Sequence, residues 1–435
     1  MKRQSFETLA LEKIVGGGQA LGTLADGRKC FVWGGLPGET VTVRITKKKS
    51  HLVEAVVEEV ISPSPDRIQP RDPDSYLSTS PWQIMPLELE QMHKAQLIDD
   101  AFTLHDVMLP GEIEVYCDNV AYGYRNKVEF SWYSEAGECG DTLDLAFFRR
   151  GSKGKIIVNG TSLARPEINN LARAIRDLLR HKHISARQLK TLLIRCDQSG
   201  SCVWQLYLKD RLPEIITADE AAKLPAQGGE VIYSDPRSPA SRITERLTQF
   251  GNTTLTDTIL GIPFRYACEG FFQVNLPAYE QALRDMRQWV PLATDQPILD
   301  FYAGVGTIGL TIASGNVTLV EINADAVREM QRNITELGHT NACAVLAPSE
   351  QALDHITGRE IVIVDPPRAG LHPDVIATLL QQLPPRILYL SCNPVTQARD
   401  VALLQQHYRI AWHRGYNFFP RTPHSEHLVV LDKIS

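Results

Sequence analysis

Four short apolar runs, separated by stretches with helical spacing, dominate the chain from about residue 290 onward. The runs are Ile298–Asp300, Val317–Val320, Ile361–Val364 and Arg386–Leu390, and Ala324–Leu337 is the clearest helical stretch between them. Short apolar strands that alternate with helices are typical of a doubly wound sheet, because one parallel strand can follow another only after a crossover, which is usually a helix. We therefore expect an α/β domain here, with a mixed, mainly parallel sheet.

Two further regions precede this domain. Gly-rich turns between short β-branched runs at residues 8–61 predict a five-stranded barrel of the oligonucleotide-binding type. A Pro-rich connector follows at residues 62–73, and residues 112–250 mix strand-like runs with one clear helix, as in an α+β domain. Because 435 residues exceed what one core usually organises, we predict three domains, at residues 1–62, 63–250 and 251–435.

A Gly-rich turn, Gly304-Val-Gly-Thr-Ile-Gly309, follows the first apolar run, which ends in Asp300. Glycines let a ligand approach the backbone at the carboxyl end of a strand, where open α/β sheets bind their ligands. Glu321 ends the next run about twenty residues further on, where an acid can accept hydrogen bonds from a ribose diol. These features favour a nucleoside cofactor over a plain strand-to-helix turn, and both NAD and S-adenosylmethionine fit the spacing.

Two more motifs follow the third and fourth runs. Asp365-Pro-Pro-Arg-Ala-Gly370 places an aspartate before two prolines, which fix an extended loop with few backbone donors. A dehydrogenase has no evident use for this loop, whereas many methyltransferases hold such a loop against the target base. Ser391-Cys392-Asn-Pro394 places a thiol at the same edge of the sheet, and a thiolate there can act as a nucleophile. An isolated cysteine is more often a buried apolar residue, so the functional interpretation depends on all these motifs together.

A last group of candidate residues lies just before the terminal apolar run. His424, Glu426 and His427 could each act as a general base. Taken without context, a glutamate before a strand is more often a surface residue.

Charge and cysteine content exclude some classes of protein. The eight cysteines are scattered without a C-x-x-C pair, so we expect no disulfide framework. The net charge is −6, and three basic stretches (44–49, 149–155 and 180–190) could contact RNA, although each alone is more often a solvated face. No run is apolar and long enough to span a membrane, and residues 1–7 lack the apolar core of a signal peptide, which predicts a cytoplasmic protein.

Together, these motifs resemble those of the RNA 5-methyluridine (uracil-C5) methyltransferases, which act on tRNA or large-subunit ribosomal RNA. The most specific parts are Ser-Cys-Asn-Pro with Ala398-Arg-Asp400, the Asp-Pro-Pro-Arg-Ala-Gly loop and the His-x-Glu near the end. The resemblance covers nearly the whole chain. It implies an N-terminal TRAM domain, a central RNA-binding domain and a Rossmann-like class I methyltransferase domain that uses S-adenosylmethionine.

By that resemblance, Cys392 matches the family nucleophile and Glu426 matches its base. The positions that match cofactor contacts are Gln273, Tyr302, Thr307, Glu321 and Asp365. The chemistry suits these residue types. A thiolate that adds to C6 of uracil makes C5 nucleophilic, and a base can then remove the C5 proton.

Two places depart from the family pattern. Many members hold an iron–sulfur cluster on four cysteines, but residues 77–83 and Ser162 supply none here, so we expect neither a cluster nor a metal site. Pro348 stands where the family often has a polar residue facing the cofactor. A contact there would have to come from the backbone or from Glu350.

The leading hypothesis is an enzyme that methylates one uridine of RNA. The N-terminal barrel, which tRNA-specific bacterial members tend to lack, favours 23S rRNA, and tRNA stays open as the alternative. Two other classes are a non-catalytic RNA-binding module on the same scaffold and an amino-methyltransferase that uses Asp365 and needs no thiol. We expect a monomer that binds RNA and no membrane.

Overall fold

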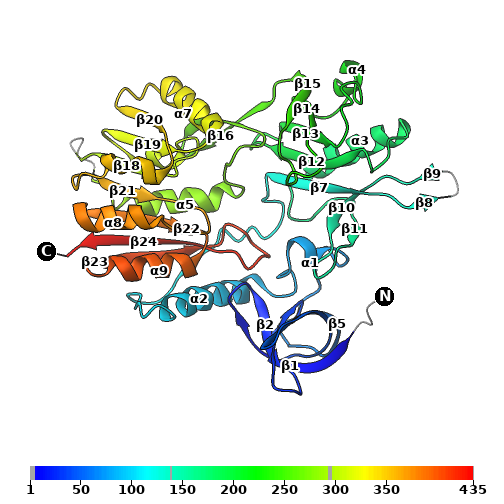
Figure 1. Ribbon diagram of the computed structural model, residues 1–435, viewed down its shortest axis with the longest axis horizontal. Helices are drawn as coiled ribbons and strands as arrows, with labels where there is room; N and C mark the ends of the chain where they lie inside the picture. The colour runs from blue at the N-terminus through cyan, green and yellow to red at the C-terminus, as the bar shows by residue number, and fades with distance from the viewer. Residues whose placement is uncertain (1–4, 138–139, 292–295, 435) are drawn as a thin grey trace. The chain divides into compact units, whose positions relative to one another are not determined.

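The computed structural model describes residues 5–137, 140–291 and 296–434 (Figure 1). Its contacts divide the chain into two compact units. Unit 1 consists of residues 1–90, 120–255 and 420–423, and unit 2 consists of residues 91–119, 256–419 and 424–435. The predicted boundary at 250/251 falls close to the change of unit after residue 255. The division into three domains stays a prediction.

The N-terminal part of unit 1 is a closed barrel with the strand order β1-β2-β3-β5-β4. Its strands are β1 (Phe6–Val15), β2 (Gln19–Thr23), β3 (Lys29–Trp33), β4 (Thr40–Lys48) and β5 (Leu52–Ser62). Buried and exposed residues alternate along β2, β3 and the first half of β4, as expected where one face of a strand lines the interior. The predicted oligonucleotide-binding type of barrel is confirmed.

The rest of unit 1 is built on a seven-stranded sheet with the order β11-β10-β7-β12-β13-β14-β15. The strands are β7 (Lys127–Tyr133), β10 (Asp144–Phe148), β11 (Lys155–Ile157), β12 (Leu189–Cys196), β13 (Cys202–Leu208), β14 (Gly228–Tyr233) and β15 (Glu245–Gly251). Helix α3 (Pro166–His181) buries its apolar face, including Ile168 and Leu179, in the core of this sheet. Shorter elements are α1 (Tyr76–Thr79), α4 (Ala218–Ala221), β8 (Ala136–Gly137) and β9 (Gly140–Asp141). The predicted α+β region is confirmed.

A polar network occupies the place where cluster-holding relatives are expected to carry cysteines. The Asp72 carboxylate accepts hydrogen bonds from Ser162 Oγ at 2.7 Å, Gln83 Nε2 at 3.1 Å and Thr161 Oγ1 at 3.3 Å. Gln83 Nε2 also donates to Ser80 Oγ at 2.7 Å. Hydrogen bonds between neutral side chains and a carboxylate thus join these segments of unit 1. Among the described residues, no group of three or more His, Cys, Asp or Glu side chains could hold a metal ion.

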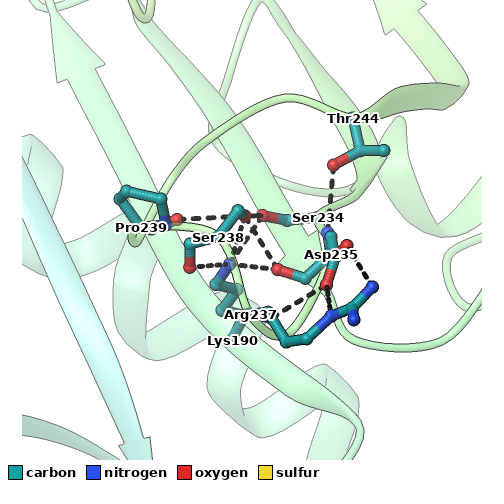
Figure 2. Close-up of polar contacts among 7 residues, drawn as sticks. All are labelled: Lys190, Ser234, Asp235, Arg237, Ser238, Pro239 and Thr244. Carbon is teal, nitrogen blue, oxygen red and sulfur yellow. Dashed lines mark hydrogen bonds and ion pairs between the residues drawn. The ribbon is translucent and has the colours of Figure 1, made fainter.

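Lys190, the last residue of the third basic stretch, is used inside unit 1 (Figure 2). Its ammonium donates to Ser234 Oγ and Asp235 O, both at 2.8 Å, and to Ser238 O at 2.9 Å. The amine therefore fixes the loop between β14 and β15 by supplying donors to its carbonyl groups.

Two other cations of the same stretch are also engaged within unit 1. Arg180 forms an ion pair with Asp144, and Lys182 Nζ lies 2.8 Å from Glu220 Oε2. These contacts support the structural interpretation of this stretch over a free RNA-binding face.

Unit 2 is built on an eight-stranded sheet with the order β20-β19-β18-β21-β22-β24-β23-β6. The strands are β6 (Val115–Tyr116), β18 (Ile298–Phe301), β19 (Val317–Glu321), β20 (Ala342–Leu346), β21 (Ile361–Val364), β22 (Arg386–Ser391), β23 (Tyr408–Tyr416) and β24 (Glu426–Lys433). Strands β18 to β22 run parallel, and β24 is antiparallel to both β22 and β23. The predicted mixed, mainly parallel sheet is confirmed.

Helices lie beside this sheet, and some of them connect its parallel strands (Figure 1). They are α2 (Leu87–Thr103), α5 (Leu276–Arg287), α6 (Thr307–Ile312), α7 (Ala324–Glu336), α8 (Pro373–Gln382) and α9 (Pro394–Leu404), with 3₁₀ turns η1 (Ser349–Gln351) and η2 (Leu353–His355). A separate hairpin consists of β16 (Thr254–Ile259) and β17 (Ile262–Ala267). Within the described ranges, no helix is both long and apolar enough to cross a bilayer.

Candidate active site

The carboxyl edge of the parallel strands in unit 2 brings the two predicted reactive residues together. Strands β22 and β24 are antiparallel, and their last registered pair is Ser391 with His427. If this register is continued by one residue, Cys392, which directly follows β22, comes opposite Glu426, the first residue of β24. Directly opposed residues of an antiparallel pair have Cβ atoms about 4.5–5.5 Å apart on one face, so the register places the thiol and the carboxyl group side by side.

Asp365 reaches the same edge from the neighbouring strand. It follows β21 directly, and Val364, the last residue of β21, pairs with Tyr389 of β22. Asp365 therefore lies level with the end of β22, one strand away from the Cys392–Glu426 pair. This arrangement places two carboxyl groups and a thiol at one site.

Burial and mutual repulsion raise the pKa values of these side chains. Burial raises the pKa of the Cys392 thiol to about 11, and the charges of Glu426 and Asp365 add to that shift, whereas Arg368 opposes it. Burial, with the charge of Asp365, also raises the pKa of Glu426 well above its ordinary value, and Arg368 again opposes the shift. Burial raises the pKa of Asp365 to about 7. A thiolate and a carboxylate formed here are consequently a strong nucleophile and a strong base.

Hydrogen bonds tie the two motif loops to each other. Asn393 Nδ2 donates to Arg368 O at 2.9 Å, which joins the residue after the thiol to the loop after Asp365. The buried Asp400 carboxylate accepts from Leu371 N and from the Tyr389 hydroxyl, both at 2.8 Å. The spacing of Ser-Cys-Asn-Pro and Ala-Arg-Asp in the sequence thus has a structural reason, because Asp400 holds the loop that carries Asp365 and Arg368.

The structure separates the three candidate bases near the end of the chain. His427 is fully buried, and its ring nitrogens lie 2.8 Å from Gln397 Oε1 and 3.2 Å from His413 Nδ1. Burial lowers the pKa of His427 well below its ordinary value, so it is a neutral structural residue. His424 is exposed and lies 3.5 Å from Arg368. Glu426 is the member of the three whose register position is opposite the thiol.

The Gly-rich turn has the geometry of a ligand-binding loop. Gly306 has φ +89°, a conformation that favours glycine, and it is the N-cap of α6. A Cβ atom at Gly309 would lie 2.5 Å from Leu319 and 2.9 Å from Asp300, so only glycine fits this approach of helix to sheet. The Gly309 N–H donates to Asp300 Oδ2 at 2.8 Å, while Asp300 Oδ1 is buried without a protein partner.

Glu321 is positioned by the same turn. One of its oxygens accepts from Gly304 N at 3.0 Å, and the other accepts from Asn323 N at 2.8 Å. The carboxylate is half-buried at the end of β19, where its remaining lone pairs can accept from the hydroxyls of a ribose. The turn, the orphaned Asp300 oxygen and Glu321 therefore fit a nucleoside cofactor.

The remaining predicted cofactor residues lie around the start of α6 or in the segment before α5. Tyr302 directly follows β18 with φ +63°, a strained value for a residue with a side chain. Thr307 begins α6, and its hydroxyl lies 2.8 Å from the Tyr279 hydroxyl. Gln273 is 7% exposed and lies between β17 and α5.

Three neighbouring residues were not expected from the sequence. Ser349 Oγ donates to the Tyr302 hydroxyl at 2.8 Å, so a polar side chain is present next to Pro348 after all. Tyr279 is fully buried, and its pKa is raised well above its ordinary value by burial and by the nearby Asp365, Asp300 and Glu426. Arg368 has a signal only in its place within the Asp-Pro-Pro-Arg motif, and Tyr279 and Ser349 have none.

Comparisons with known proteins identify the family of the chain. The family model of the tRNA (uracil-5-)-methyltransferases matches residues 90–434. The chain belongs to this family. It is an RNA methyltransferase that depends on S-adenosylmethionine, as the family resemblance implied.

Relatives and solved structures match almost the whole methyltransferase. An uncharacterized RNA methyltransferase of Nitratidesulfovibrio vulgaris is 28% identical over 460 residues, covering 97% of this chain and 95% of the relative. One of Thermosynechococcus vestitus is 28% identical over 440 residues, covering 97% of each chain. The crystal structure of Pyrococcus abyssi tRNA (uracil-54, C5)-methyltransferase in complex with S-adenosyl-L-homocysteine has a TM-score of 0.78 and 22% identity, and the match covers 97% of this chain and 100% of that one. The Rossmann-like class I methyltransferase fold is thereby confirmed.

Proposed function

We propose that the methyltransferase transfers a methyl group to C5 of one specific uridine in RNA through a covalent bond between Cys392 and C6 of the base. The observation that supports this most directly is the register of β22 and β24, which sets Cys392 opposite Glu426 at the ligand-binding edge of the sheet. An enzyme that methylates an amino group needs no thiol at this position, and a module that only binds RNA needs neither residue.

The predicted cofactor residues would hold S-adenosylmethionine at the edge of the sheet. S-adenosylmethionine supplies an electrophilic methyl group. Glu321 would hold the ribose and Thr307 would border the adenosine at the start of α6, with Gln273 and Tyr302 as further contacts. Asp365 would lie at the boundary between the cofactor and the target base, as it follows β21 at the centre of the edge.

The reaction follows from the chemistry of uracil. The Cys392 thiolate adds to C6, and the electron pair of the C5–C6 double bond moves into an enolate. C5 of that enolate takes the methyl group. Glu426 then removes the remaining C5 proton, and the C6–sulfur bond breaks to regenerate the double bond and the thiolate. The base must leave its stack to reach the site, which costs least in a loop of the RNA.

The protonation states of Cys392 and Glu426 set the pH dependence of the reaction. The thiol, with its pKa of about 11, must lose a proton before it adds to the base, and Glu426 must be ionised before it can accept one. Both requirements favour alkaline pH. The kcat/KM for methylation should therefore rise with pH above neutrality.

For the substrate we propose 23S rRNA, with tRNA as the second candidate. The nucleic-acid-binding type of barrel in unit 1 supports an RNA with structure beyond the target loop. Because the structure of a tRNA (uracil-54, C5)-methyltransferase matches 97% of this chain, tRNA stays the second candidate. The monomeric state and the cytoplasmic location stay predictions.

The deciding experiment is incubation of the purified protein with tritiated S-adenosylmethionine and separate pools of unmodified tRNA and 23S rRNA, followed by nucleoside mass spectrometry. We expect 5-methyluridine in the rRNA pool. Its appearance in tRNA alone would change the substrate but keep the reaction. No methylation of either pool, with cofactor binding intact, would favour the RNA-binding module.

A further inference from the structure

A groove in unit 1 that is lined in part by two arginines is not explained by the methyl-transfer chemistry. It has a volume of about 380 Å³, and its lining includes Arg71, Tyr122, Asn170 and Arg173. An adjoining groove of about 410 Å³ shares Arg71 with it and extends toward Asp72 and Asp74. None of the three basic stretches of the sequence includes Arg71 or Arg173.

Arg71 is held in place but keeps its hydrogen-bonding capacity. Its guanidinium lies 3.9 Å from the centre of the Tyr122 ring, a cation–π contact that fixes the plane of the group. Among the described residues, no side chain or carbonyl accepts a hydrogen bond from Arg71, and the residue is exposed. Its five N–H donors are therefore available to a ligand.

A second arginine in unit 1 makes the same cation–π contact but also has a carboxylate partner. Arg211 lies 3.9 Å from the centre of the Tyr233 ring, the same distance as Arg71 from Tyr122. However, Arg211 Nε donates to Glu245 at 2.7 Å. The two stacked pairs thus differ in the carboxylate partner, which Arg211 has and Arg71 lacks.

The groups around Arg71 also present donors. Arg173 is held by hydrogen bonds to Asn159 O at 2.8 Å and Asn170 Oδ1 at 2.5 Å, so the amide oxygen of Asn170 is used and its NH₂ group is left as a donor. Burial raises the pKa of the Tyr122 hydroxyl, which therefore keeps its proton. A surface of cationic and neutral donors fits the oxygens of an anion.

The carboxylates nearby do not cancel this preference at the Tyr122 end. Asp72 Oδ2 accepts hydrogen bonds from Ser162, Gln83 and Thr161, and Asp72 Oδ1 accepts from Ser162 N at 3.2 Å. Asp74 is exposed and lines only the adjoining groove. An anion would consequently bind beside Arg71 and Arg173, away from Asp74.

We propose that this groove binds a phosphodiester of the RNA substrate, with Arg71 as the main donor to the phosphate oxygens and Arg173 as the second. The inference rests on the proposed function in one respect, namely that the substrate is RNA. Contacts of this kind fix the register of the nucleic acid on the protein without reading its sequence. The groove would thus help to fix the register of the bound RNA on unit 1.

The test compares Arg71→Gln with Arg211→Gln. Both variants remove one positive charge from an arginine stacked on a tyrosine in unit 1. For Arg71→Gln we expect the KM for RNA to rise about three- to tenfold, and the slope of log KM against log salt concentration to fall by about 0.7–1, the value for one phosphate contact. We expect kcat at saturating RNA and the affinity for S-adenosylmethionine to stay at wild-type values. Arg173→Gln should change in the same direction by less.

The salt slope separates a phosphate contact from a structural effect. A higher KM with an unchanged slope would mean that Arg71→Gln only disturbs the fold, and the inference would be wrong. Equal behaviour of Arg71→Gln and Arg211→Gln would also overturn it while leaving the proposed reaction intact. If the wild type methylated no RNA, fluorescence anisotropy with the same RNAs would test the groove. Weaker, less salt-dependent binding by Arg71→Gln alone would support it, and equal binding by the variants would refute it.

Discussion

Two buried glutamates, Glu39 in unit 1 and Glu426 in unit 2, have pKa values that are shifted in opposite directions. In unit 1, Glu39 accepts hydrogen bonds from Arg67 Nη2 at 2.7 Å, Leu36 N at 2.8 Å and Ser64 N at 3.2 Å. Burial alone would raise the pKa of Glu39, but these partners outweigh it and the pKa is lowered. In unit 2, no hydrogen bond reaches the side chain of Glu426 from the described residues, and its pKa is raised well above the ordinary value.

The comparison separates a carboxylate that stabilises the fold from one that is available for proton transfer. A buried carboxylate with a cation and two N–H donors keeps its charge, because each partner favours the ionised form. A buried carboxyl group without such partners has a raised pKa. Once ionised, it is a stronger base than an ordinary carboxylate, which is typical of a catalytic base. Substitutions at the two sites should therefore affect different properties of the protein.

The largest effect is expected at the thiol opposite Glu426. Cys392→Ala removes the nucleophile that must add to C6, so turnover should fall by at least about 10⁴-fold. The affinity for S-adenosylmethionine by calorimetry should stay near the wild-type value. Cys343→Ala, which changes an exposed cysteine of the same unit, is the control and should be fully active. Retained methylation in Cys392→Ala would favour an amino-methyltransferase.

The next effect tests Glu426 itself. Glu426→Gln cannot take the C5 proton, so the reaction should stop after methyl transfer at the covalent adduct, and turnover should fall about 10²- to 10⁴-fold. A protein–RNA band that survives denaturing gel electrophoresis should accumulate. Stability should not fall, because a neutral isostere replaces a buried acid without partners. Normal turnover would show that the proton leaves by another route.

The matching substitution in unit 1 should reverse this pattern. Glu39→Gln leaves Arg67 without its carboxylate and should destabilise unit 1 by about 3 kcal/mol, while the Cys392 reaction is unaffected. Urea unfolding followed by hydrogen exchange of barrel peptides reports this loss locally. The lowered pKa of Glu39 fixes the sign of the pH dependence. Its contribution is present above the unfolded pKa and is lost as the pH falls through the folded value.

The difference between wild type and Glu39→Gln should therefore be largest above pH ~5 and shrink toward pH ~3. A gap that stays constant over this range would mean that Glu39 acts through packing alone.

In unit 2, the positions of the strands could be predicted from the sequence, whereas the contacts between distant residues could not. The apolar runs at 298–300 and 361–364 form strands, as predicted. A strand that is covered on both faces of a parallel sheet is apolar throughout, so the sequence pattern is easy to detect. The pairing of Cys392 with Glu426 could not be derived from the residues alone. It depends on β24 running antiparallel beside β22 after 34 intervening positions, and only the family resemblance indicated Glu426.

The roles of charged residues in unit 1 were the hardest to predict. The basic stretch at 180–190 could have contacted RNA, but Lys190 binds the loop at Ser234–Ser238 and Arg180 pairs with Asp144. Arg71 belongs to none of the three basic stretches. Among the described residues, no acceptor takes a hydrogen bond from its guanidinium, which stacks on Tyr122. Whether a cation is available depends on the acceptors that the fold brings to it, and these are distant in the chain.

The smallest effect concerns Arg368, the cation that faces the thiol and Glu426. Its charge lowers the pKa of both groups against burial and the carboxylates, so Arg368→Gln should raise both pKa values. The rise of kcat/KM with pH should move to higher pH by up to about one unit. Alkylation of Cys392 by iodoacetamide at pH 9, measured in a Cys343→Ala background, should slow by up to about tenfold.

Arg328→Gln removes the same charge from helix α7 of unit 2, where Arg328 pairs with Asp325, and should leave both profiles unchanged. If the two variants shifted the alkylation profile equally, the effect would come from the net charge of the protein and not from the position of Arg368. If only Arg368→Gln shifted it, the contrast with Glu39 would be complete. One arginine in contact keeps Glu39 ionised, whereas an exposed arginine without a hydrogen bond to Glu426 only limits the rise of its pKa.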